Sequence, residues 1–567
     1  EKAGQMVMAW FGGRYMPEDS DELEVARDAI VDAGVGGVIV SIGQPLVVAQ
    51  KLNRFQALAD VPLIVASDME NGPAMRLRGG VLLPSGADLG GGTVFPPTMG
   101  VGATGDPDLA YEMGRVTSIE GRAVGVHLDF APVVDVNNNP ANPVINTRSY
   151  GEDPRQVARF GAAQVRGLQD HGMLATAKHF PGHGDVAGDS HLVPLILRID
   201  AARADSVELV PFRATIDAGV AAVMSAHVTF PALTGDSIRP ATLSSRMLDS
   251  LLVDEMGFEG LVVTDALTMG AIVERYGPEE AAVLAMEAGA DILLQPTDVA
   301  RTVDAVAEAV EQGRFTEARL DRSVRKILEA KARVGLHRNR YVDLETVAQR
   351  VGGRDHQALA DSIAARSITL VRDRENLVPL SPGAHARILA IVHVDEVNPF
   401  AGRDFLRTLE SGVPSLERVT LGMDEPAAVL DSVAERAEAA DLVLLVSEVR
   451  VRSGKGGIAM DEAVAALFSD LATRKPAVAI SFGSPYLLQQ IPDVGSYMVA
   501  WGSETPSQVA AARALLGRAP IAGRLPISIP PLHRRGELGV ARSAVDVRLG
   551  RTRRVGRTGA AGAREQH

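Results

Sequence analysis

The sequence predicts an α/β protein: an N-terminal (β/α)8 barrel of the TIM type, followed by a C-terminal α/β sandwich domain. Over residues 1–336, short apolar runs alternate with segments of helical period. These runs are continuously apolar, which is typical of parallel strands covered on both faces. Strand–helix units repeated over roughly 300 residues favour a closed barrel over the alternative, an open doubly wound sheet.

The barrel strands are predicted from these apolar runs in chain order, and we expect at least one strand to be degenerate. The helical period is clearest at 155–170 and 278–288, and the segment 316–334 is typical of the last helix of a barrel. The predicted strands are GGVIVS (36–41), PLIVASD (62–68), HLDFAPVVDV (127–136), MLATAKHF (173–180), AAVMSAHV (221–228), GLVVTDAL (260–267) and ADILLQP (290–296).

A second α/β unit is predicted at 367–531, after a polar segment at 337–366 that we interpret as a linker. Residues 532–567 are rich in Arg and Gly and have little apolar periodicity, which indicates a solvated tail. The strand-like runs of the second unit are SITLVRD (367–373), RILAIVHV (387–394), DLVLLVS (441–447), PAVAISFG (476–483) and YMVAWG (497–502).

The composition of the 567-residue chain, 46% hydrophobic and 23% charged, is that of a soluble globular protein. Its formal net charge of −14 argues against a nucleic-acid surface, which needs clustered Lys and Arg. No apolar run approaches the ~20 residues of a membrane-spanning helix. The absence of cysteine excludes disulfides, thiolate catalysis and Cys-bound metals. The chain begins within a helical pattern and without Met, so we expect an upstream segment such as a signal peptide.

Polar residues recur at or just after the carboxyl ends of the predicted barrel strands. The active sites of such barrels are assembled at that end, from several different strands. Any one of these residues could simply cap the next helix, but their recurrence at successive strands favours a shared site. They are Asp68, Asp135, Lys178 with His179, His227 and Asp265.

The segment KHFPGHGDVAGDSH (178–191) concentrates one Lys, three His and two Asp around three glycines. A metal site is disfavoured, because the spacing matches neither H-E-x-x-H nor another zinc pattern. An acid/base loop is the functional alternative, since Asp189 and His191 would share one side of an extended segment. The carboxylate would then hold one imidazole nitrogen and raise the basicity of the other. A surface loop whose polar groups satisfy their own backbone fits the composition equally well.

Asp265 directly follows the apolar run GLVVT. Its simplest role is the N-cap of the next helix, and its functional role would be a carboxylate nucleophile in the barrel mouth. Arg76, Arg148, Lys178 and His179 offer donors for a hydroxyl-rich ligand, although each alone is more often a solvated charge or a structural ion pair.

GVGATG (100–105) matches the G-x-G-x-x-G pattern of dinucleotide sites, but FPPTM precedes it in place of a strand. We therefore predict a turn there. No cofactor and no metal are predicted for the chain.

The chain resembles glycoside hydrolase family 3, specifically its two-domain β-N-acetylglucosaminidase branch. The resemblance extends over about residues 3–531, and the pair KHFPGHG (178–184) and DSH (189–191) is the most specific part of it. The other motifs are FAPVVDVN (130–137), NTRSYGEDP (146–154), MSAHVTFPAL (224–233), GLVVTDALTMGAI (260–272) and SITLVRD (367–373).

The resemblance implies roles for residues at matching positions. Asp265 is expected to be the nucleophile, and His191, oriented by Asp189, the general acid/base that replaces the usual carboxylic acid. Residues expected to bind the N-acetylglucosamine are Asp68, Arg76, Arg148, Lys178 and His179, with His227 and Asp135 in supporting roles. The family's acidic-Gly-Gly-Arg pattern is replaced by DMENGP (68–73), and an insert follows at 81–92, which leaves the preference for the leaving group open.

The resemblance thus predicts a retaining exo-β-N-acetylglucosaminidase that acts on peptidoglycan fragments or chitooligosaccharides. Three alternatives stay open: a phosphorylase, because a His acid/base does not repel phosphate as a Glu would; a β-glucosidase of the same family; and a catalytically silent carbohydrate-binding protein. We expect a carbohydrate substrate as the partner, no nucleic acid, no membrane span, and a secreted or cell-envelope location. The oligomeric state is left open.

Overall fold

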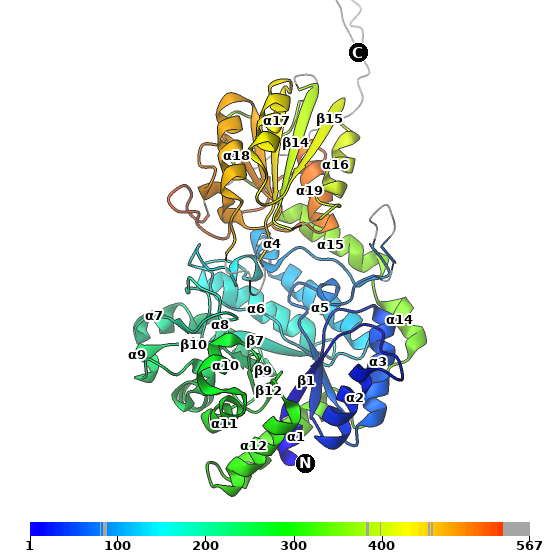
Figure 1. Ribbon diagram of the computed structural model, residues 1–567, viewed down its shortest axis with the longest axis vertical. Helices are drawn as coiled ribbons and strands as arrows, with labels where there is room; N and C mark the ends of the chain where they lie inside the picture. The colour runs from blue at the N-terminus through cyan, green and yellow to red at the C-terminus, as the bar shows by residue number, and fades with distance from the viewer. Residues whose placement is uncertain are drawn as a thin grey trace, which may run out of the picture.

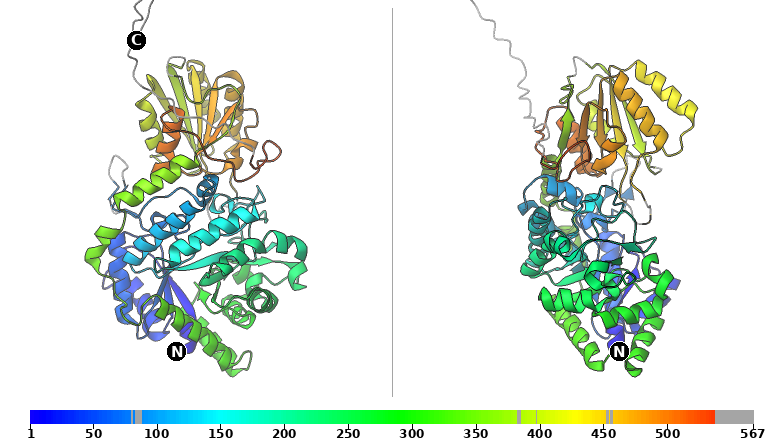
Figure 2. Two further views of the ribbon diagram at one scale, coloured as in Figure 1. Left: turned by 180° about the vertical axis from the view of Figure 1, so that it is seen from behind. Right: turned by 90° about the vertical axis from the view of Figure 1, so that its left-hand side faces the viewer.

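The computed structural model describes residues 1–79, 81–82, 88–381, 385–396, 398–451, 454 and 457–536. The N-terminal part forms a barrel, and a second domain lies on one end of it (Figures 1 and 2). The predicted fold, a barrel followed by an α/β sandwich, is therefore confirmed. No helix among the described residues is long and apolar enough to cross a membrane.

The barrel sheet has eight parallel strands in the order β11-β9-β7-β6-β3-β2-β1-β12. A parallel bridge between Val263 and Ile292 joins the two ends of this order and closes the barrel. The strands are β1 (Val7–Phe11), β2 (Gly37–Val40), β3 (Ile64–Ser67), β6 (Leu128–Asp129), β7 (Leu174–Phe180), β9 (Ala222–Ser225), β11 (Leu261–Thr264) and β12 (Leu293–Leu294).

Two of these strands differ from the sequence prediction. The strand missing from the predicted set is β1, whose side chains are buried except for Trp10. The run at 127–136 contains only the short β6, because Pro132 has no N–H with which to continue the ladder. Its later part returns to the sheet through a single bridge between Val133 and Lys178.

A ring of helices covers the barrel, and amphipathic sequence sets their inward faces. In α6, Pro154 occupies the first turn and the Asp153 carboxylate accepts hydrogen bonds from the N–H groups of Arg155 and Gln156. The helices of this ring are α2 (Asp21–Arg27), α3 (Pro45–Leu58), α5 (Asp108–Ala123), α6 (Pro154–Gln169), α8 (Leu209–Asp217), α11 (Pro278–Ala288), α12 (Val299–Glu311) and α13 (Glu317–Arg333). Smaller helices in the connections are α1 (Lys2–Gln5), α4 (Thr98–Ala103), α7 (Ala201–Ser206), α9 (Pro231–Thr234) and α10 (Gly270–Tyr276).

The segment predicted as a linker is largely helical. It contains α14 (Leu344–Arg350) and α15 (Arg354–Ser367), and α15 packs against α4 of the barrel and α19 (Thr505–Leu515) of the second domain. Ala360, Ile363 and Ala364 bury the apolar face of α15. Because that face is interrupted by polar residues on both sides, the sequence pattern alone indicated a connection and not a packed helix.

The second domain is a six-stranded sheet in the order β13-β18-β17-β16-β14-β15, in which only β13 runs antiparallel to its neighbour. Alternate residues of the strands face two separate apolar cores, one under α17 and α18 and the other under α16 and α19. The remaining elements are β13 (Thr369–Asp373), β14 (Arg387–Val394), β15 (Ser415–Leu421), β16 (Leu442–Glu448), β17 (Ala477–Ser481), β18 (Ser496–Val499), α16 (Arg403–Glu410), α17 (Ala427–Glu438) and α18 (Glu462–Arg474).

The segment predicted as a tail is described only at its start. His533 donates its backbone N–H to the Ile529 carbonyl, and the Arg372 guanidinium contacts the His533 ring. Residues 532–536 are therefore attached to the second domain. Residues 537–567 of the predicted tail lie outside the described residues.

Candidate active site

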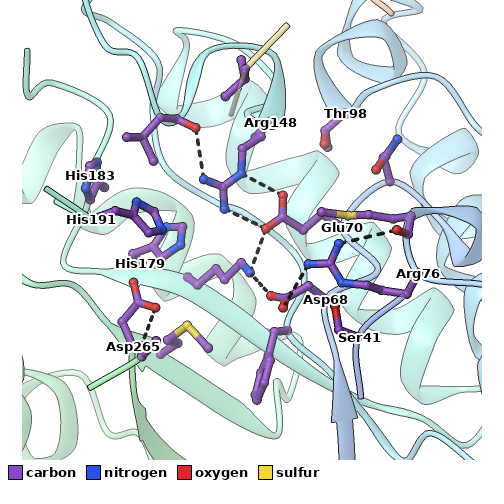
Figure 3. Close-up of a pocket in the computed structure, with 18 of the residues that line it drawn as sticks. Ser41, Asp68, Glu70, Arg76, Thr98, Arg148, His179, His183, His191 and Asp265 are labelled. Carbon is purple, nitrogen blue, oxygen red and sulfur yellow. Dashed lines mark hydrogen bonds and ion pairs between the residues drawn. The ribbon is translucent and has the colours of Figure 1, made fainter. Parts of the chain in front are cut away.

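A cavity of about 500 Å³ lies at the carboxyl ends of the barrel strands and is lined by both domains. The barrel contributes side chains from the ends of β1, β2, β3, β7, β11 and β12. The second domain contributes residues that follow β16, β17 and β18, namely Arg450, Val451, Gly483, Trp501, Gly502 and Glu504. In Figure 3, a network of charged residues occupies one side of this cavity, and Asp265 with three histidines occupies the other.

The charged network is built around Lys178, whose ammonium lies 2.9 Å from Asp68 Oδ1 and 2.8 Å from Glu70 Oε1. The Arg76 guanidinium contacts the other oxygen of Asp68 at 3.3 Å. The Arg148 guanidinium donates to both oxygens of Glu70, at 2.9 and 2.7 Å. Lys178 and Glu70 are almost fully buried, whereas Asp68, Arg76 and Arg148 are 21–29% exposed. The exposed members can therefore reach a ligand, while the buried pair fixes their positions.

Glu70 is a functional candidate that the sequence interpretation missed. Burial alone would raise the pKa of its carboxyl, but Arg148 and Lys178 hold that pKa well below the ordinary value. Burial would likewise raise the pKa of the Asp68 carboxyl, but the positive charges of Lys178 and Arg76 lower it below the ordinary value. The available signal was the spacing, since Glu70 follows Asp68 by two residues and thus projects to the same side of an extended segment.

Asp265 projects into the cavity from the residue after β11. Its Oδ1 accepts a hydrogen bond of 2.8 Å from the Ala266 N–H. Burial would raise the pKa of this carboxyl, but His179, His227 and the Ala266 N–H lower it to about 2. Asp265 is not an N-cap, because α10 begins only at Gly270 and its cap residue is Met269. The carboxylate is therefore ionised at neutral pH and free of the helix-capping role that the sequence allowed.

Asp189 and His191 form a hydrogen-bonded pair, with His191 Nδ1 2.7 Å from Asp189 Oδ1. The same oxygen accepts the His191 backbone N–H at 2.9 Å, so the pair forms within a turn and not in the extended segment that we predicted. Asp189 is buried, while the His191 side chain is 32% exposed and lines the cavity. Within the described part of the chain, Nε2 of His191 has no hydrogen-bond partner, so it is available to a ligand.

A contact from the second domain completes the surroundings of Asp189. Its Oδ2 accepts a hydrogen bond of 2.7 Å from the backbone N–H of Gly454. Burial raises the pKa of this carboxyl, but the hydrogen bonds from His191 and from Gly454 outweigh it, so the pKa lies below the ordinary value. An ionised Asp189 holds the His191 proton on Nδ1 and leaves Nε2 as the group that exchanges protons.

His179 lines the cavity beside Lys178, although neighbouring residues of a regular strand point to opposite faces. The register of β7 against β9 shifts between Lys178 and Phe180, and this irregularity turns both side chains toward the mouth of the barrel. His183, which the sequence interpretation did not select, also lines the cavity. Its Nε2 lies 2.9 Å from the Ser190 hydroxyl, and burial lowers its pKa to about 4. Through this hydrogen bond, the neutral His183 connects the start of the segment 178–191 to the turn that contains Asp189 and His191.

Asp135 and His227 were predicted to support sugar binding, but neither lines the cavity. Asp135 is fully buried, with Oδ2 2.7 Å from His179 Nδ1 and Oδ1 accepting the N–H of His183. His227 Nδ1 lies 2.8 Å from the Thr242 hydroxyl, and its Nε2 lies 3.0 Å from the Ala266 carbonyl. Neither side chain is therefore placed to contact a substrate in this cavity. Each holds the backbone or ring of a cavity residue instead.

Trp10 is the large apolar group of the cavity that the sequence interpretation missed. It is 48% exposed on a strand that is otherwise buried, and it lines the cavity near Gln295 and Leu294. An exposed indole at the barrel mouth offers a flat face to a sugar ring. Among the described residues, no group of three or more His, Asp or Glu side chains is placed to hold a metal ion.

Comparison with known proteins agrees with this architecture. The family model of the glycosyl hydrolase family 3 N-terminal domain matches residues 1–330. The chain is 30% identical over 511 residues to a β-N-acetylglucosaminidase/β-glucosidase of Cellulomonas fimi, which covers 87% of this chain and 88% of that protein.

Solved structures are similar over nearly the whole chain. One is a family 3 β-N-acetylglucosaminidase from Paenibacillus sp. FPU-7, with a TM-score of 0.82 and 34% identity, covering 93% of this chain and 98% of that one. Another is the β-glucoside phosphorylase BglX, with a TM-score of 0.82 and 27% identity, covering 94% of each chain. The resemblance found in the sequence motifs is confirmed, and the chain belongs to glycoside hydrolase family 3.

Proposed function

We propose that this protein is a retaining exo-β-N-acetylglucosaminidase that works through a covalent glycosyl–Asp265 intermediate. The observation that carries the proposal is the shared cavity of two groups: an ionised carboxylate, Asp265, and a hydrogen-bonded pair, Asp189–His191, with an available Nε2. A retaining glycosidase needs these two functions on the two sides of one glycosidic bond. The names of the relatives from Cellulomonas fimi and Paenibacillus support the choice of sugar.

In the first step, an Asp265 oxygen forms a bond to the anomeric carbon while the bond from that carbon to the leaving oxygen breaks. The Nε2–H of protonated His191 gives its proton to that oxygen. In the second step, Nε2 removes a proton from water, whose oxygen displaces Asp265 from the anomeric carbon. The sugar is released with its configuration retained, and His191 returns to its protonated form. Asp189 stabilises the imidazolium at each end of the cycle.

The charged network supports recognition of one terminal sugar. Asp68, Arg76 and Arg148 are partly exposed toward the cavity and present both acceptors and donors to hydroxyl groups. The buried Lys178 and Glu70 form ion pairs with Asp68 and Arg148, so these groups are held in place before the substrate binds. A cavity of about 500 Å³ at the barrel mouth, covered in part by the second domain, favours an end sugar over the middle of a chain, which supports exo-cleavage.

Phosphorolysis is the second candidate, because a neutral His191 does not repel a phosphate that replaces water in the second step. The similarity to a β-glucoside phosphorylase supports this second candidate. N,N′-diacetylchitobiose and 4-nitrophenyl N-acetylglucosaminide, each incubated with and without phosphate, decide between the two. We expect N-acetylglucosamine under both conditions, and N-acetylglucosamine 1-phosphate as the main product would refute the hydrolase.

For the natural substrate we propose N-acetylglucosamine-terminated peptidoglycan fragments or chitooligosaccharides, and a secreted or cell-envelope location.

A β-glucosidase is the further alternative, supported by the double name of the Cellulomonas relative. The ratio of kcat/KM on 4-nitrophenyl N-acetylglucosaminide to that on 4-nitrophenyl glucoside tests it. A ratio well above one is expected, and equal values would favour the glucosidase. If Asp265→Ala turns over every N-acetylglucosaminide as fast as the wild type, the protein is not the proposed enzyme.

A further inference from the structure

The second domain covers the cavity with residues that follow its parallel strands. After β18, Trp501 adopts a left-handed backbone conformation with φ of 69°, and its indole N–H donates to the Ser367 carbonyl at 2.8 Å. The buried ring packs on α4, where a Cβ at Gly100 would lie 3.2 Å from Trp501 Cβ. This anchored segment holds Glu504, the cap residue of α19, at the cavity wall.

Glu504 is fixed in place, and it forms no ion pair with a described residue. A Cβ at Gly502 would lie 2.0 Å from Glu504 Oε2 and 2.6 Å from Pro97, so the carboxyl packs against the backbone of Gly502 at the boundary with the barrel. Oε2 is buried and makes no hydrogen bond with any described residue. Burial raises the pKa of this carboxyl, and its own backbone N–H, Arg450 and Arg78 offset part of this effect.

Arg450, which follows β16, likewise lacks an ionic partner among the described residues. Its Nε is buried without a hydrogen-bond partner, and its guanidinium forms no ion pair with an acidic group among the described residues. Glu504 and Arg450 therefore line one cavity with opposite charges that influence each other but do not meet. The barrel side differs, because there every charge of the Lys178 network is paired. Buried charged groups without partners are costly, so groups left open toward a cavity indicate a ligand that completes them.

The contact between Gly454 and Asp189 shows which part of a substrate these residues would meet. Gly454 lies four residues after Arg450, and its N–H donates to Asp189 Oδ2 at 2.7 Å. In the proposed function, His191 protonates the oxygen of the leaving group. In Figure 3, His191 lies across the cavity from the barrel network that is proposed to hold the terminal sugar.

We propose that Arg450 and Glu504 form a subsite for the leaving group and select a 2-acetamido sugar there. The Glu504 carboxylate accepts hydrogen bonds from the hydroxyl or amide N–H groups of that sugar, and Arg450 donates to its carbonyl or to a carboxylate that it carries. The inference rests on the proposed function for its direction, but binding to the subsite does not require that the bond is cleaved. A chitooligosaccharide and a peptidoglycan fragment share this chemistry and differ in the carboxylate.

Binding tests the subsite independently of catalysis. In an Asp265→Asn background, calorimetry measures Kd for N,N′-diacetylchitobiose, for N-acetylglucosaminyl-N-acetylmuramic acid and for N-acetylglucosamine. We expect Glu504→Gln and Arg450→Gln to weaken both disaccharides by about tenfold or more, and the monosaccharide by much less. A larger loss for the acidic disaccharide in Arg450→Gln identifies the peptidoglycan fragment as the source, and equal losses identify the chitooligosaccharide.

Kinetics on the otherwise unaltered enzyme provide the second arm. Both variants should lower kcat/KM more on the disaccharides than on 4-nitrophenyl N-acetylglucosaminide, whose leaving group has no matching polar groups. Glu417→Gln and Arg436→Gln, an exposed ion pair of the same domain, are the matched controls and should change nothing. Equal losses of the variants on every ligand, or no loss on any, would overturn the subsite. Failure of the wild type to cleave any N-acetylglucosaminide would instead refute the proposed function and leave the binding result to judge the subsite.

Discussion

Replacing Glu70 by Gln tests whether the charged network is the support of the sugar site. The Glu70 carboxylate accepts two hydrogen bonds from Arg148 and one from Lys178, at 2.7–2.9 Å, and its side chain is 4% exposed. Gln keeps the shape and one acceptor oxygen but removes the negative charge. Lys178 then keeps Asp68 as its only carboxylate among the described residues, and Arg148 loses its bidentate partner.

Breaking a buried ion pair by removing one partner costs about 3–5 kcal/mol, and we expect the lower end because Arg148 is partly exposed. The free energy of unfolding should therefore fall by about 3 kcal/mol at pH 7. Urea denaturation followed by the intrinsic fluorescence of the two tryptophans, Trp10 and Trp501, measures this change. Glu280→Gln, which removes an exposed partner of Arg314, is the control and should cost less than about 1 kcal/mol.

The effect of pH on this stability difference can also be predicted. The pKa of Glu70 is lowered by folding, so its contribution to stability is present above the ordinary value of 4.5 and is lost as the pH falls through the lower pKa of the folded protein. The difference between wild type and Glu70→Gln should thus shrink on acidification below about pH 4.5. A variant as stable as the wild type at pH 7, or a difference that grows in acid, would refute the view that Arg148 and Lys178 are held by this charge.

Three further predictions concern the proposed chemistry. Asp265→Ala should lower kcat on 4-nitrophenyl N-acetylglucosaminide by on the order of 10⁴ or more, and because the pKa of Asp265 is about 2, wild-type activity lost between pH 6 and pH 4 should not trace to its protonation. Asp189→Asn should lower kcat by roughly 10²–10⁴, with a smaller loss for aryl leaving groups that need little protonation, and equal losses for all leaving groups would contradict the acid role. Trp10→Ala should raise KM by about three- to tenfold while kcat changes less, as steady-state kinetics can separate, and an unchanged KM would exclude Trp10 as a sugar platform.

The sequence predicts the fold and several of the residues that surround the cavity, because both leave local patterns. Continuous apolar runs gave the parallel strands, and the motif pair at 178–191 gave Lys178, His179, Asp189 and His191, all of which contact the cavity or its lining. The missed strand β1 has five residues and directly follows a helical turn, so its apolar residues continue the helical pattern of the preceding residues. Trp10 was missed with it.

The remaining features depend on contacts between distant segments, which no local pattern contains. Asp135 and His227 end strands as the other candidates do, but buried partners, the His179 ring and the Ala266 carbonyl, turn them away from the cavity. Glu70 becomes a candidate only because Lys178 and Arg148 converge on it from two other segments. Arg450 and Glu504 become candidates only because the second domain lies on the barrel mouth.

The contact between Gly454 and Asp189 suggests why a barrel that carries the proposed acid/base pair also has a second domain over it. Gly454 adopts φ of 78°, a left-handed conformation that glycine adopts without strain, and a Cβ there would meet nothing within 4 Å. Gly454→Val should therefore disturb the backbone N–H and not the packing. Without that hydrogen bond the pKa of Asp189 rises, so the acid limb of kcat/KM should move to higher pH.

Gly313, with φ of 73° and an equally open Cβ position between α12 and α13, is the matched control, because Gly313→Val introduces the same strain far from the cavity. Its pH profile should match that of the wild type even if its stability falls. Identical profiles for Gly454→Val and Gly313→Val would mean that Asp189 is held by His191 alone. A shift confined to Gly454→Val would mean that the second domain sets the ionisation of the carboxylate on which the proton transfer by His191 depends.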